Sequence, residues 1–274
     1  MNTLKDLKKL TDTFAESKTK MPVLFVGHGS PMNGIEDNEF SRRWAEMGKT
    51  IPLPNAVIVV SAHWFTSGTK ITAMDRPRTI HDFYGFPKAL FDVKYPAPGH
   101  TELANETVKL IKKTRVSLDH DWGLDHGTWS IVRHMYPEAN IPVLQLSIDF
   151  SQGPRFHYEL ARELNSLRNK GVLIIGSGNM VHNLRMIDWR NPDSGFDWAV
   201  EMNEKFKKLI TEGNHEQLIH FESLGHSAKL SIPTPEHYLP LLYTLGLQEK
   251  NDAVSLFNDK TLMGSISMTS VKVG

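Results

Sequence analysis

The stretch Val-Leu-Phe-Val-Gly-His, residues 23–28, is an apolar run that ends on a histidine. A second run, Val-Ile-Val-Val-Ser-Ala-His at 57–63, ends in the same way, and His182 follows Gly-Val-Leu-Ile-Ile-Gly-Ser-Gly at 171–178. Short, nearly continuous apolar runs are typical of strands that are covered on both faces of a sheet. In an open α/β sheet, ligands bind in the crevice outside the carboxyl ends of the strands, so we expect these histidines to meet in one cleft.

From Pro22 onward, apolar runs alternate with helical patterns along the chain. We predict strands at 22–27, 56–62, 70–74, 142–148, 171–176 and 262–268. We predict helices at 38–47, 101–113, 128–136, 155–169, 198–211 and 236–245. This alternation favours an α/β fold with a central, largely parallel (mixed) sheet that is flanked by helices on both faces. The polar stretches 64–100 and 188–197 contain Gly and Pro, and we expect them to form loops over the cleft.

The length of 274 residues, with 40% hydrophobic residues, is sufficient for one large domain with a well-buried core. We see no internal repeat, low-complexity tract or long linker, so a single catalytic domain is expected at 21–274. Residues 1–20 are expected to form an amphipathic N-terminal extension, because apolar side chains recur there at helical spacing among lysines. These side chains are Leu4, Leu7, Leu10 and Phe14.

The composition argues against several kinds of partner. Lys and Arg together number 31, as do Asp and Glu, so no net field favours nucleic acid or an anionic membrane. The absence of cysteine excludes disulfides, thiolate metal sites and a cysteine nucleophile, and leaves nitrogen and oxygen ligands for any metal. No apolar run approaches the roughly 18–20 residues that span a bilayer, and we expect a cytoplasmic monomer or small homo-oligomer.

Five of the 13 histidines stand in unusual sequence contexts. They are His28 in Gly-His-Gly-Ser-Pro-Met, His63 in Ser-Ala-His-Trp, His126 in Asp-His-Gly-Thr-Trp, His182 in Gly-Asn-Met-Val-His-Asn and His237 in Pro-Thr-Pro-Glu-His-Tyr-Leu-Pro. The glycines on both sides of His28 allow the backbone to approach a ligand closely. Most other histidines lie in polar or helical surroundings and are expected at the surface or in structural roles: His100, His120, His134, His157, His215, His220 and His226.

Any one of these five histidines could be a buried structural residue, but His28 and His63 together favour a metal site. Neutral imidazole suits Zn, Fe(II), Cu or Ni, and two such ligands need only one or two further donors to hold a metal with open positions. The spacing matches no short zinc motif such as His-Glu-x-x-His, so this prediction depends on the placement at strand ends. Ser30 and Ser177 do not fit the Gly-x-Ser-x-Gly pattern of a serine nucleophile.

Seven segments occur in order between Met21 and the C-terminus: Gly-His-Gly-Ser-Pro-Met (27–32), Val-Val-Ser-Ala-His-Trp (59–64), Thr-Ile-His-Asp-Phe (79–83), Tyr-Pro-Ala-Pro-Gly (95–99), Asp-His-Gly-Thr-Trp (125–129), Gly-Asn-Met-Val-His-Asn-Leu (178–184) and Thr-Pro-Glu-His-Tyr-Leu-Pro-Leu (234–241). Together they resemble the class III extradiol ring-cleavage dioxygenases, most closely the 4,5-DOPA extradiol branch. The resemblance implies a mononuclear non-haem Fe(II) enzyme that opens a catechol ring with O₂, beside one of the two hydroxyls. With L-DOPA the product would be 4,5-seco-DOPA.

By this resemblance His28 and His63 match the two histidine ligands of one divalent metal ion. The third ligand is a glutamate in the protocatechuate-cleaving relatives, whereas here Glu236 is followed directly by His237. Similarity to the DOPA-type branch favours His237 as the ligand. That departure would make the site more cationic and more tolerant of Zn²⁺, so Fe(II) is expected for ring cleavage and Zn²⁺ is an alternative occupant of the isolated protein.

The resemblance also assigns residues that move protons. His182 matches the general base and is also a candidate metal ligand, and its ordinary pKa of about 6.5 suits proton transfer near neutrality. His126 matches a second-sphere histidine that hydrogen-bonds the substrate hydroxyl or bound oxygen. Asp125 either orients His126 or caps the helix predicted at 128–136.

Other side chains near these motifs have two interpretations, as pocket lining or as loop and core structure: Ser30, His81, Asn179, Asn183, Tyr238, Trp64 and Trp129. Two other functions also stay open. Histidine-bound zinc can activate water, which would make the protein a zinc-dependent hydrolase of a small substrate. A non-catalytic binding protein on the same fold is the second alternative, although a pure binding module needs no base beside a metal.

Overall fold

The computed structural model describes residues 19–274, and in it the apolar runs form the centre of a sheet. In β1 (Val23–Gly27), Phe25 joins one buried cluster of side chains and Leu24 joins a second cluster. Because successive side chains point to opposite faces of a strand, this division means that both faces are covered. The extension predicted at 1–20 lies outside the described residues except for its last two.

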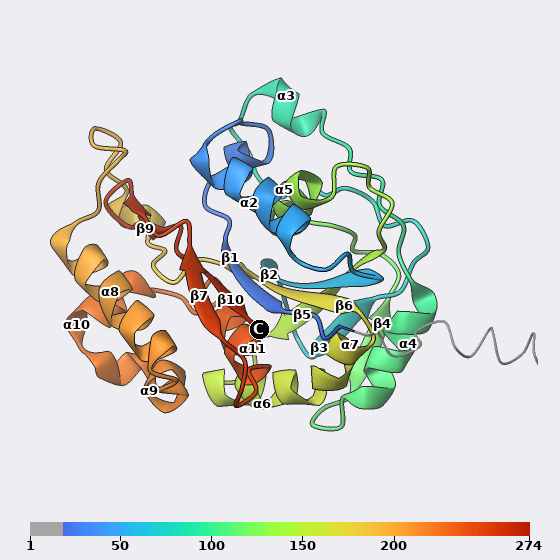
Figure 1. The fold of residues 1–274 in the computed structure, drawn as a ribbon. Helices are drawn as coiled ribbons and strands as arrows, with labels where there is room; N and C mark the ends of the chain where they lie inside the picture. Colours follow the sequence, from blue (N-terminus) through green and yellow to red (C-terminus); the bar gives the residue numbers. More distant parts are fainter. Residues whose placement is uncertain (1–18) are drawn as a thin grey trace, which may run out of the picture.

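The main sheet has eight strands in the order β4-β3-β5-β2-β6-β1-β10-β7 (Figure 1). Neighbours among β5, β2, β6 and β1 run parallel, whereas β10 is antiparallel to both β1 and β7, and β3 is antiparallel to β5. The predicted largely parallel, mixed sheet is therefore confirmed. The other strands are β2 (Ala56–Thr66), β3 (Thr69–Thr72), β4 (Val116–Asp119), β5 (Val143–Asp149), β6 (Val172–Gly178), β7 (Val254–Phe257) and β10 (Ser270–Val273).

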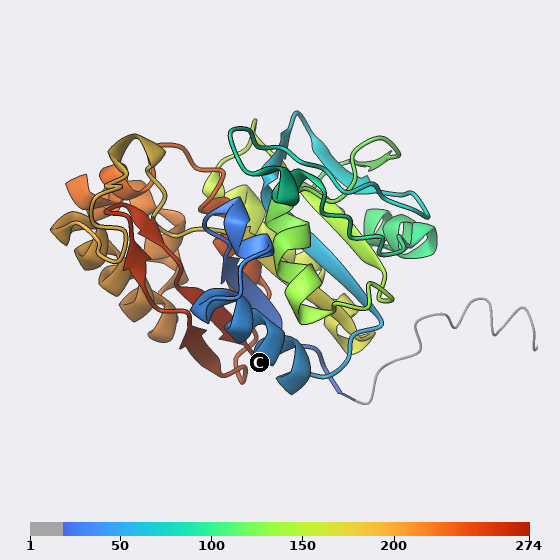
Figure 2. The same ribbon diagram turned by 90° about the horizontal axis from the view of Figure 1, so that it is seen from above.

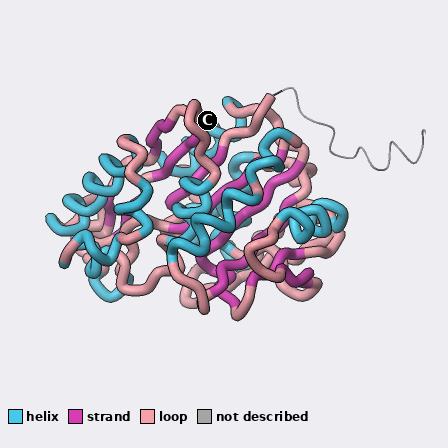
Figure 3. Tube along the Cα trace, turned by 90° about the horizontal axis from the view of Figure 1, so that it is seen from below, coloured by secondary structure: helices cyan, strands magenta, loops and turns pink. Residues whose placement is uncertain are grey.

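Helices cover both faces of this sheet (Figures 1 and 2). On one face lie α2 (Glu39–Thr50) and α5 (His126–Met135), which bury Trp44 and Trp129. The other face is covered by four helices: α4 (Thr101–Leu110), α6 (Pro154–Glu163), α7 (Asn165–Asn169) and α11 (Leu239–Gly246). Seen from below, helices lie in front of the strands (Figure 3).

A third group of helices packs beside the β10 and β7 edge of the sheet (Figure 1): α8 (Asp197–Thr211), α9 (His215–Ile219) and α10 (His226–Ser231). A short helix, α3 (Lys88–Phe91), lies in the predicted loop 64–100, and three 3-10 helices complete the helical segments: η1 (Pro31–Gly34), η2 (Leu184–Met186) and η3 (Phe221–Leu224). None of the helices within residues 19–274 combines the length and the apolar character that crossing a bilayer requires.

The strand predicted at 262–268 is wrong. This segment forms a separate hairpin of β8 (Thr261–Leu262) and β9 (Ile266–Ser267), outside the main sheet. The chain turns between them because Met263 and Gly264 have φ angles of 49° and 78°, in the left-handed region that no strand adopts. The main-sheet strands β4, β7 and β10 were not predicted.

Two predicted helices also have different limits. The helix predicted at 155–169 divides at Leu164 into α6 and α7. The helix predicted at 236–245 begins only at Leu239, with Pro240 in its first turn. Proline lacks an N–H, but N–H groups in the first turn have no partner within the helix, so no hydrogen bond is lost. His237 therefore lies in the turn that precedes α11.

A core histidine makes stability depend on pH. His157 in α6 is fully buried, its Nδ1 lies 3.0 Å from the Tyr243 hydroxyl, and burial lowers its pKa to about 4. An unfolded histidine titrates near 6.5, so the unfolded chain binds more protons between these values and the folded state loses stability as pH falls through this window. When the pH is lowered from 7.5 to 5, the free energy of unfolding should fall in both proteins. We expect this fall to be about 2 kcal/mol smaller in His157→Gln than in the wild type.

Urea unfolding at the two pH values measures this difference. His226→Gln is the matched control, because His226 is exposed on α10 and should leave the pH dependence unchanged. Equal acid losses in the His157 variant and the wild type would contradict the prediction.

Candidate metal centre

The five histidines singled out in the sequence meet at one end of β1, β2 and β6. The ring centroid of His28 lies 5.0 Å from that of His63 and 5.2 Å from that of His237. The ring of His126 lies 3.9 Å from His63, and the ring of His182 lies 3.5 Å from His237. The strand ends thus bring together imidazoles that are far apart in the sequence.

His28 follows directly on β1. Its backbone N–H donates to the Gly178 carbonyl at 3.2 Å, which continues the parallel pairing of β1 with β6. A Cβ on Gly27 would lie 2.6 Å from the Met268 carbonyl oxygen, so this glycine allows close packing of two backbones. The sequence predicted that the glycines beside His28 let the backbone approach a ligand. At Gly27 the backbone instead approaches the backbone of Met268.

His63 lies inside β2, which does not end at 62 as predicted but continues to Thr66. The register of β2 against β5 shifts between Val60 and Phe65, and His63 lies within this irregular segment. Bulges of this kind re-aim a side chain relative to the regular pleat. The irregular pairing accordingly sets the direction of the His63 ring.

His126 is the first residue of α5, and Asp125 is the N-cap of that helix. The Asp125 Oδ1 accepts from the Thr128 N–H at 3.1 Å and from the Ser61 hydroxyl at 2.8 Å. The capping interpretation of Asp125 is thus confirmed, and none of its hydrogen bonds within residues 19–274 reaches the His126 ring. The carboxylate beside that ring is Asp82, whose Oδ1 lies 3.0 Å from His126 Nδ1 and accepts the His126 backbone N–H at 2.9 Å.

His182 lies in the segment after β6 and is held by backbone pairing on two sides. Its N–H donates to the Ser231 carbonyl at 2.8 Å, and it forms an isolated antiparallel bridge with Ile266 of β9. Its ring stacks on that of His237 with an interplanar angle of 9°. The hairpin of β8 and β9, which the structure has where a single strand was predicted at 262–268, therefore supports His182.

The position of His237 depends on the glycine that ends β6. The Asn179 N–H donates to the His237 carbonyl at 2.9 Å, and a Cβ on Gly178 would lie 2.1 Å from that carbonyl oxygen. No side chain fits at Gly178 unless the main chain of His237 moves.

We expect Gly178→Ala to weaken metal binding by about 10–100-fold, the range typical when the support of a ligand is lost. Gly153→Ala is a matched control, because a Cβ there meets nothing within 4 Å. Competition with a chromophoric chelator measures the affinity of each protein for Zn²⁺, and unchanged affinity in Gly178→Ala would contradict the packing argument.

The partners of His28 decide which of its ring nitrogens carries the proton. Its Nδ1 lies 2.9 Å from the Ser177 hydroxyl oxygen, and that hydroxyl donates its single hydrogen to the Gly127 carbonyl at 2.5 Å. The Ser177 oxygen must then accept from His28, so His28 is protonated at Nδ1. The lone pair of His28 Nε2 is left available to a ligand-binding role.

His63 and His237 have the same arrangement with carboxylates. The Nδ1 of His63 lies 3.2 Å from Asp82 Oδ2, and the Nδ1 of His237 lies 3.3 Å from Glu236 Oε1. Histidines that bind a metal usually donate the other ring N–H to a carboxylate or a similar acceptor, which fixes the tautomer and the ring orientation. These contacts favour protonation of His63 and His237 at Nδ1, which leaves Nε2 of each available, as in His28.

The spacing of His28 and His63, with His237 beside them, suits a divalent metal ion. The Nε2 atoms of His28 and His63 are 3.1 Å apart, and ligand atoms of these two residues and His237 all lie within 4.8 Å of one another. Nitrogens bound at about 2.0–2.1 Å to one ion are about 2.9–3.4 Å apart in octahedral or tetrahedral geometry. Two facing lone pairs repel unless a cation binds both, so this cluster suits a cation.

Burial keeps these ligands in the form that binds metal. Burial, followed by the charges of neighbouring histidines, holds the pKa values of His28 and His237 well below the ordinary value. Both rings are therefore neutral at neutral pH, as metal ligands must be.

Two further groups of possible ligands overlap this cluster: His63 with Asp82 and His126, and His182 with Glu236 and His237. In both groups the carboxylate lies 3.0–3.3 Å from a ring Nδ1, a position that favours an N–H proton on that nitrogen. His182 belongs to the second group and not to the cluster of His28, His63 and His237.

The charge states of the surrounding groups follow from their contacts. Burial acts to raise the pKa of Asp82, but the contacts with His126 and His63 outweigh it and hold that pKa well below its usual range. Burial, followed by the charges of His63 and His126, lowers the pKa of His182 to about 4. His182 is therefore neutral at neutral pH, with a pKa below the ordinary value expected from the sequence.

Most of the other side chains suggested as pocket lining make structural hydrogen bonds. Ser30 caps η1 by accepting from the Met32 N–H at 3.2 Å. Four side chains donate to backbone carbonyls: Asn179 to Ser267, Asn183 to Leu230, Tyr238 to Leu218 and His81 to Val93. These bonds support the structural interpretation of each residue.

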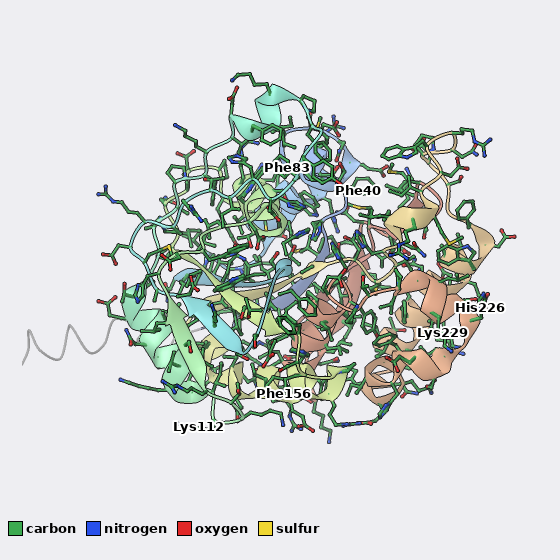
Figure 4. All side chains as sticks on the ribbon, turned by 180° about the vertical axis from the view of Figure 1, so that it is seen from behind. Phe40, Phe83, Lys112, Phe156, His226 and Lys229 are labelled. Carbon is green, nitrogen blue, oxygen red and sulfur yellow. The ribbon has the colours of Figure 1, made fainter. Side chains whose placement is uncertain are left out.

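The two tryptophans near the site pack in the interior. Trp64 stacks on Trp122 at 5.8 Å, and the Trp129 indole N–H donates to the Ile80 carbonyl at 2.8 Å. Phe83, which is labelled in Figure 4, lies in the predicted loop 64–100. Its ring is 5.6 Å from that of His126. The loop prediction at 64–100 thus includes a segment that reaches the histidines.

Comparison with known proteins agrees with this geometry. Residues 21–271 match the family model for the catalytic LigB subunit of aromatic ring-opening dioxygenase. The Escherichia coli K12 protein named 4,5-DOPA dioxygenase extradiol is 49% identical over 94% of this chain and 96% of its own length. The Beta vulgaris protein of the same name is 36% identical over 90% of this chain and 94% of its own length.

A solved structure has the same fold as this chain. The crystal structure of an uncharacterized protein from Escherichia coli K12 has a TM-score of 0.81 and 42% sequence identity to this chain, and the match covers 93% of this chain and 100% of that protein. The family match, which spans nearly all of residues 19–274, agrees with the fold and with the histidine cluster. This chain therefore belongs to the LigB family of extradiol aromatic ring-opening dioxygenases.

Proposed function

We propose that this protein uses Fe(II) and O₂ to open the ring of a catechol such as L-DOPA at the 4,5 position. We propose His28, His63 and His237 as the metal ligands. The observation that carries this proposal is the cluster of His28, His63 and His237, whose ligand atoms lie within 4.8 Å of one another while an acceptor oxygen lies beside each Nδ1. The names of the Escherichia coli and Beta vulgaris relatives support L-DOPA as the substrate.

Bound Fe(II) would supply the redox chemistry with O₂ and would favour loss of the catechol hydroxyl protons. Three neutral imidazoles leave the charge of a divalent ion undiminished, which favours an anionic substrate. A set of nitrogen ligands also suits Zn²⁺. We therefore propose Zn²⁺ as an alternative occupant that binds without supporting ring cleavage.

We propose that His182 is the base that accepts a catechol hydroxyl proton. Its neutral state at neutral pH supports this role, and its position outside the cluster of His28, His63 and His237 favours a base over a fourth ligand. A positioned base typically contributes about 10²–10⁴-fold to a rate.

We propose that His126 hydrogen-bonds the substrate hydroxyl or an oxygen atom derived from O₂. Asp82 lies against its Nδ1, which supports Nε2 as the nitrogen that faces the substrate. This arrangement would let His126 hold a proton at a defined atom without binding the metal.

The test is to load the protein with Fe(II) without oxygen, add L-DOPA, admit air and record absorbance and O₂ uptake together. We expect a yellow ring-opened product and one O₂ consumed per L-DOPA, with no turnover in the Zn²⁺-loaded protein. O₂ uptake with other catechols, but not with L-DOPA, would overturn the substrate alone. Hydrolysis by the Zn²⁺ form without any O₂-dependent ring cleavage would overturn the reaction and favour a hydrolase.

A further inference from the structure

One carboxylate lies between two of the histidines that the proposed function uses in different ways. Asp82 Oδ2 lies 3.2 Å from Nδ1 of His63, and Asp82 Oδ1 lies 3.0 Å from Nδ1 of His126. The Asp82 side chain is 17% exposed, so solvent only partly competes for its oxygens. The rings that it joins are 3.9 Å apart.

The segment that carries Asp82 is held in place on both sides. The Ile80 N–H donates to the Leu124 carbonyl at 2.7 Å, and the Ile80 carbonyl accepts from the Trp129 indole. The His81 ring donates to the Val93 carbonyl at 3.0 Å. Asp82 is therefore presented by a fixed loop, as precise orientation of other side chains requires.

We propose that Asp82 is a positioning residue shared by the metal site and the proton-transfer site, which orients the ligand His63 with one oxygen and His126 with the other. The expected effect of Asp82 on turnover rests on the proposed function. Its expected effects on metal affinity and on the ring tautomers do not.

The chemistry of a carboxylate explains why one residue serves both rings. Asp82 oxygens lie 3.2 Å from Nδ1 of His63 and 3.0 Å from Nδ1 of His126, where a carboxylate repels a ring lone pair and attracts an N–H. The contacts therefore favour the Nδ1–H form of both rings by charge, since within residues 19–274 the His126 Nδ1 makes no hydrogen bond of regular geometry. An asparagine of the same shape accepts at one end and donates at the other, so it cannot satisfy both rings. Asp82→Asn thus removes one of the two orientations without changing the volume of the side chain.

The first measurement is the metal affinity of the apo-protein, with Zn²⁺ as the probe and a chromophoric chelator as competitor. We expect Asp82→Asn to raise the dissociation constant about 10–100-fold, the usual effect of losing a partner of a metal-binding histidine. Asp119→Asn is the matched control, because Asp119 has a similar exposure of 14% and accepts from the Trp122 and Asp121 backbone. It should leave the affinity unchanged.

The second measurement is kcat for L-DOPA at saturating Fe(II), with Glu236→Gln as a comparison. Among the five histidines, Glu236 makes its only contact within 4.0 Å with His237, although His182 also lies within 4.8 Å. Glu236→Gln should therefore weaken metal binding and regain most of its kcat once the metal is saturating. Asp82→Asn should keep a lowered kcat under the same conditions. In a His126→Ala background, Asp82→Asn should lower kcat no further while it still weakens metal binding.

Two results would overturn the shared role. If the metal dissociation constant of Asp82→Asn stayed within twofold of the wild-type value, Asp82 would not orient the ligand His63. If kcat recovered fully at saturating Fe(II), Asp82 would not orient His126. Asp82→Glu, which keeps two acceptor oxygens, should recover part of the lost affinity relative to Asp82→Asn.

A spectroscopic measurement separates this proposal from the proposed function. In ¹⁵N-edited NMR of the Zn²⁺-loaded wild type we expect His63 and His126 to be protonated at Nδ1. If the wild type binds metal but cleaves no catechol, the proposed function fails, while affinity and tautomers still decide the role of Asp82. Protonation of either ring at Nε2 alone would overturn the role, even if Asp82→Asn does not fold.

Discussion

Replacing His28 or His63 by alanine is expected to abolish metal retention and to lower ring cleavage by more than about a thousandfold. Each substitution removes one of two Nε2 atoms that face each other at 3.1 Å, and leaves at most two members of the candidate ligand cluster. His126 and His182 lie outside the cluster of His28, His63 and His237, so neither is in place to substitute for the lost ligand. Metal analysis after gel filtration of Fe(II)- or Zn²⁺-loaded protein measures the retained content.

His226→Ala is the control for these variants. His226 is exposed at the start of α10, on a different part of the molecule from Phe83, which borders the histidine cluster (Figure 4). The control should retain full metal content and activity. If both His28→Ala and His63→Ala kept full metal content, the assignment of the metal centre would be wrong.

Replacing His126 by alanine is expected to give the opposite combination, with metal retained and kcat lowered by about 10²–10⁴-fold. His126 packs against His63, yet it lies outside the cluster formed by His28, His63 and His237. Its loss removes a hydrogen-bonding group near the substrate and leaves the three candidate ligands in place. Metal content and single-turnover rates at saturating Fe(II) measure the two effects separately.

His182→Ala gives a useful comparison, because its ring stacks on the candidate ligand His237. We expect it to lower kcat as strongly as His126→Ala, since both residues are assigned to proton handling. Loss of metal together with kcat in His126→Ala would contradict the separation of ligand and proton-transfer roles. Full activity of His126→Ala with bound metal would contradict its role in turnover.

The centre of the sheet could be predicted because its signal is local. The runs that became β1, β2 and β6 are apolar at nearly every position, as strands covered on both faces must be. The last two strands at one end of the sheet, β10 and β7, have short, partly polar sequences, Ser-Val-Lys-Val and Val-Ser-Leu-Phe, which carry little periodic signal. Their place in the sheet depends on contacts across long sequence separations, such as the bond from the Gly27 N–H to the Ser270 hydroxyl.

The convergence of the histidines could be predicted from their placement after strands and from recognisable motifs. Asp82 was missed as an orienting group, although it lies in the Thr-Ile-His-Asp-Phe segment, because a lone acid in a loop has no periodicity. Asp125 attracted attention as the sequence neighbour of His126, but its carboxylate caps α5. The tautomer of His28 depends on Ser177 and Gly127, which come together only in the folded chain.

The hairpin of β8 and β9, with β10 beside β1, has a consequence for biosynthesis. The Ser267 N–H donates to the Val181 carbonyl, and the Asn183 N–H donates to the Ser265 carbonyl, so residues translated more than 80 positions later brace both sides of His182. During translation, a nascent chain that ends before Ser265 can pair β1 with β6 but cannot yet fix His182. Completion of the centre must therefore follow the emergence of residues 265–273 from the ribosome.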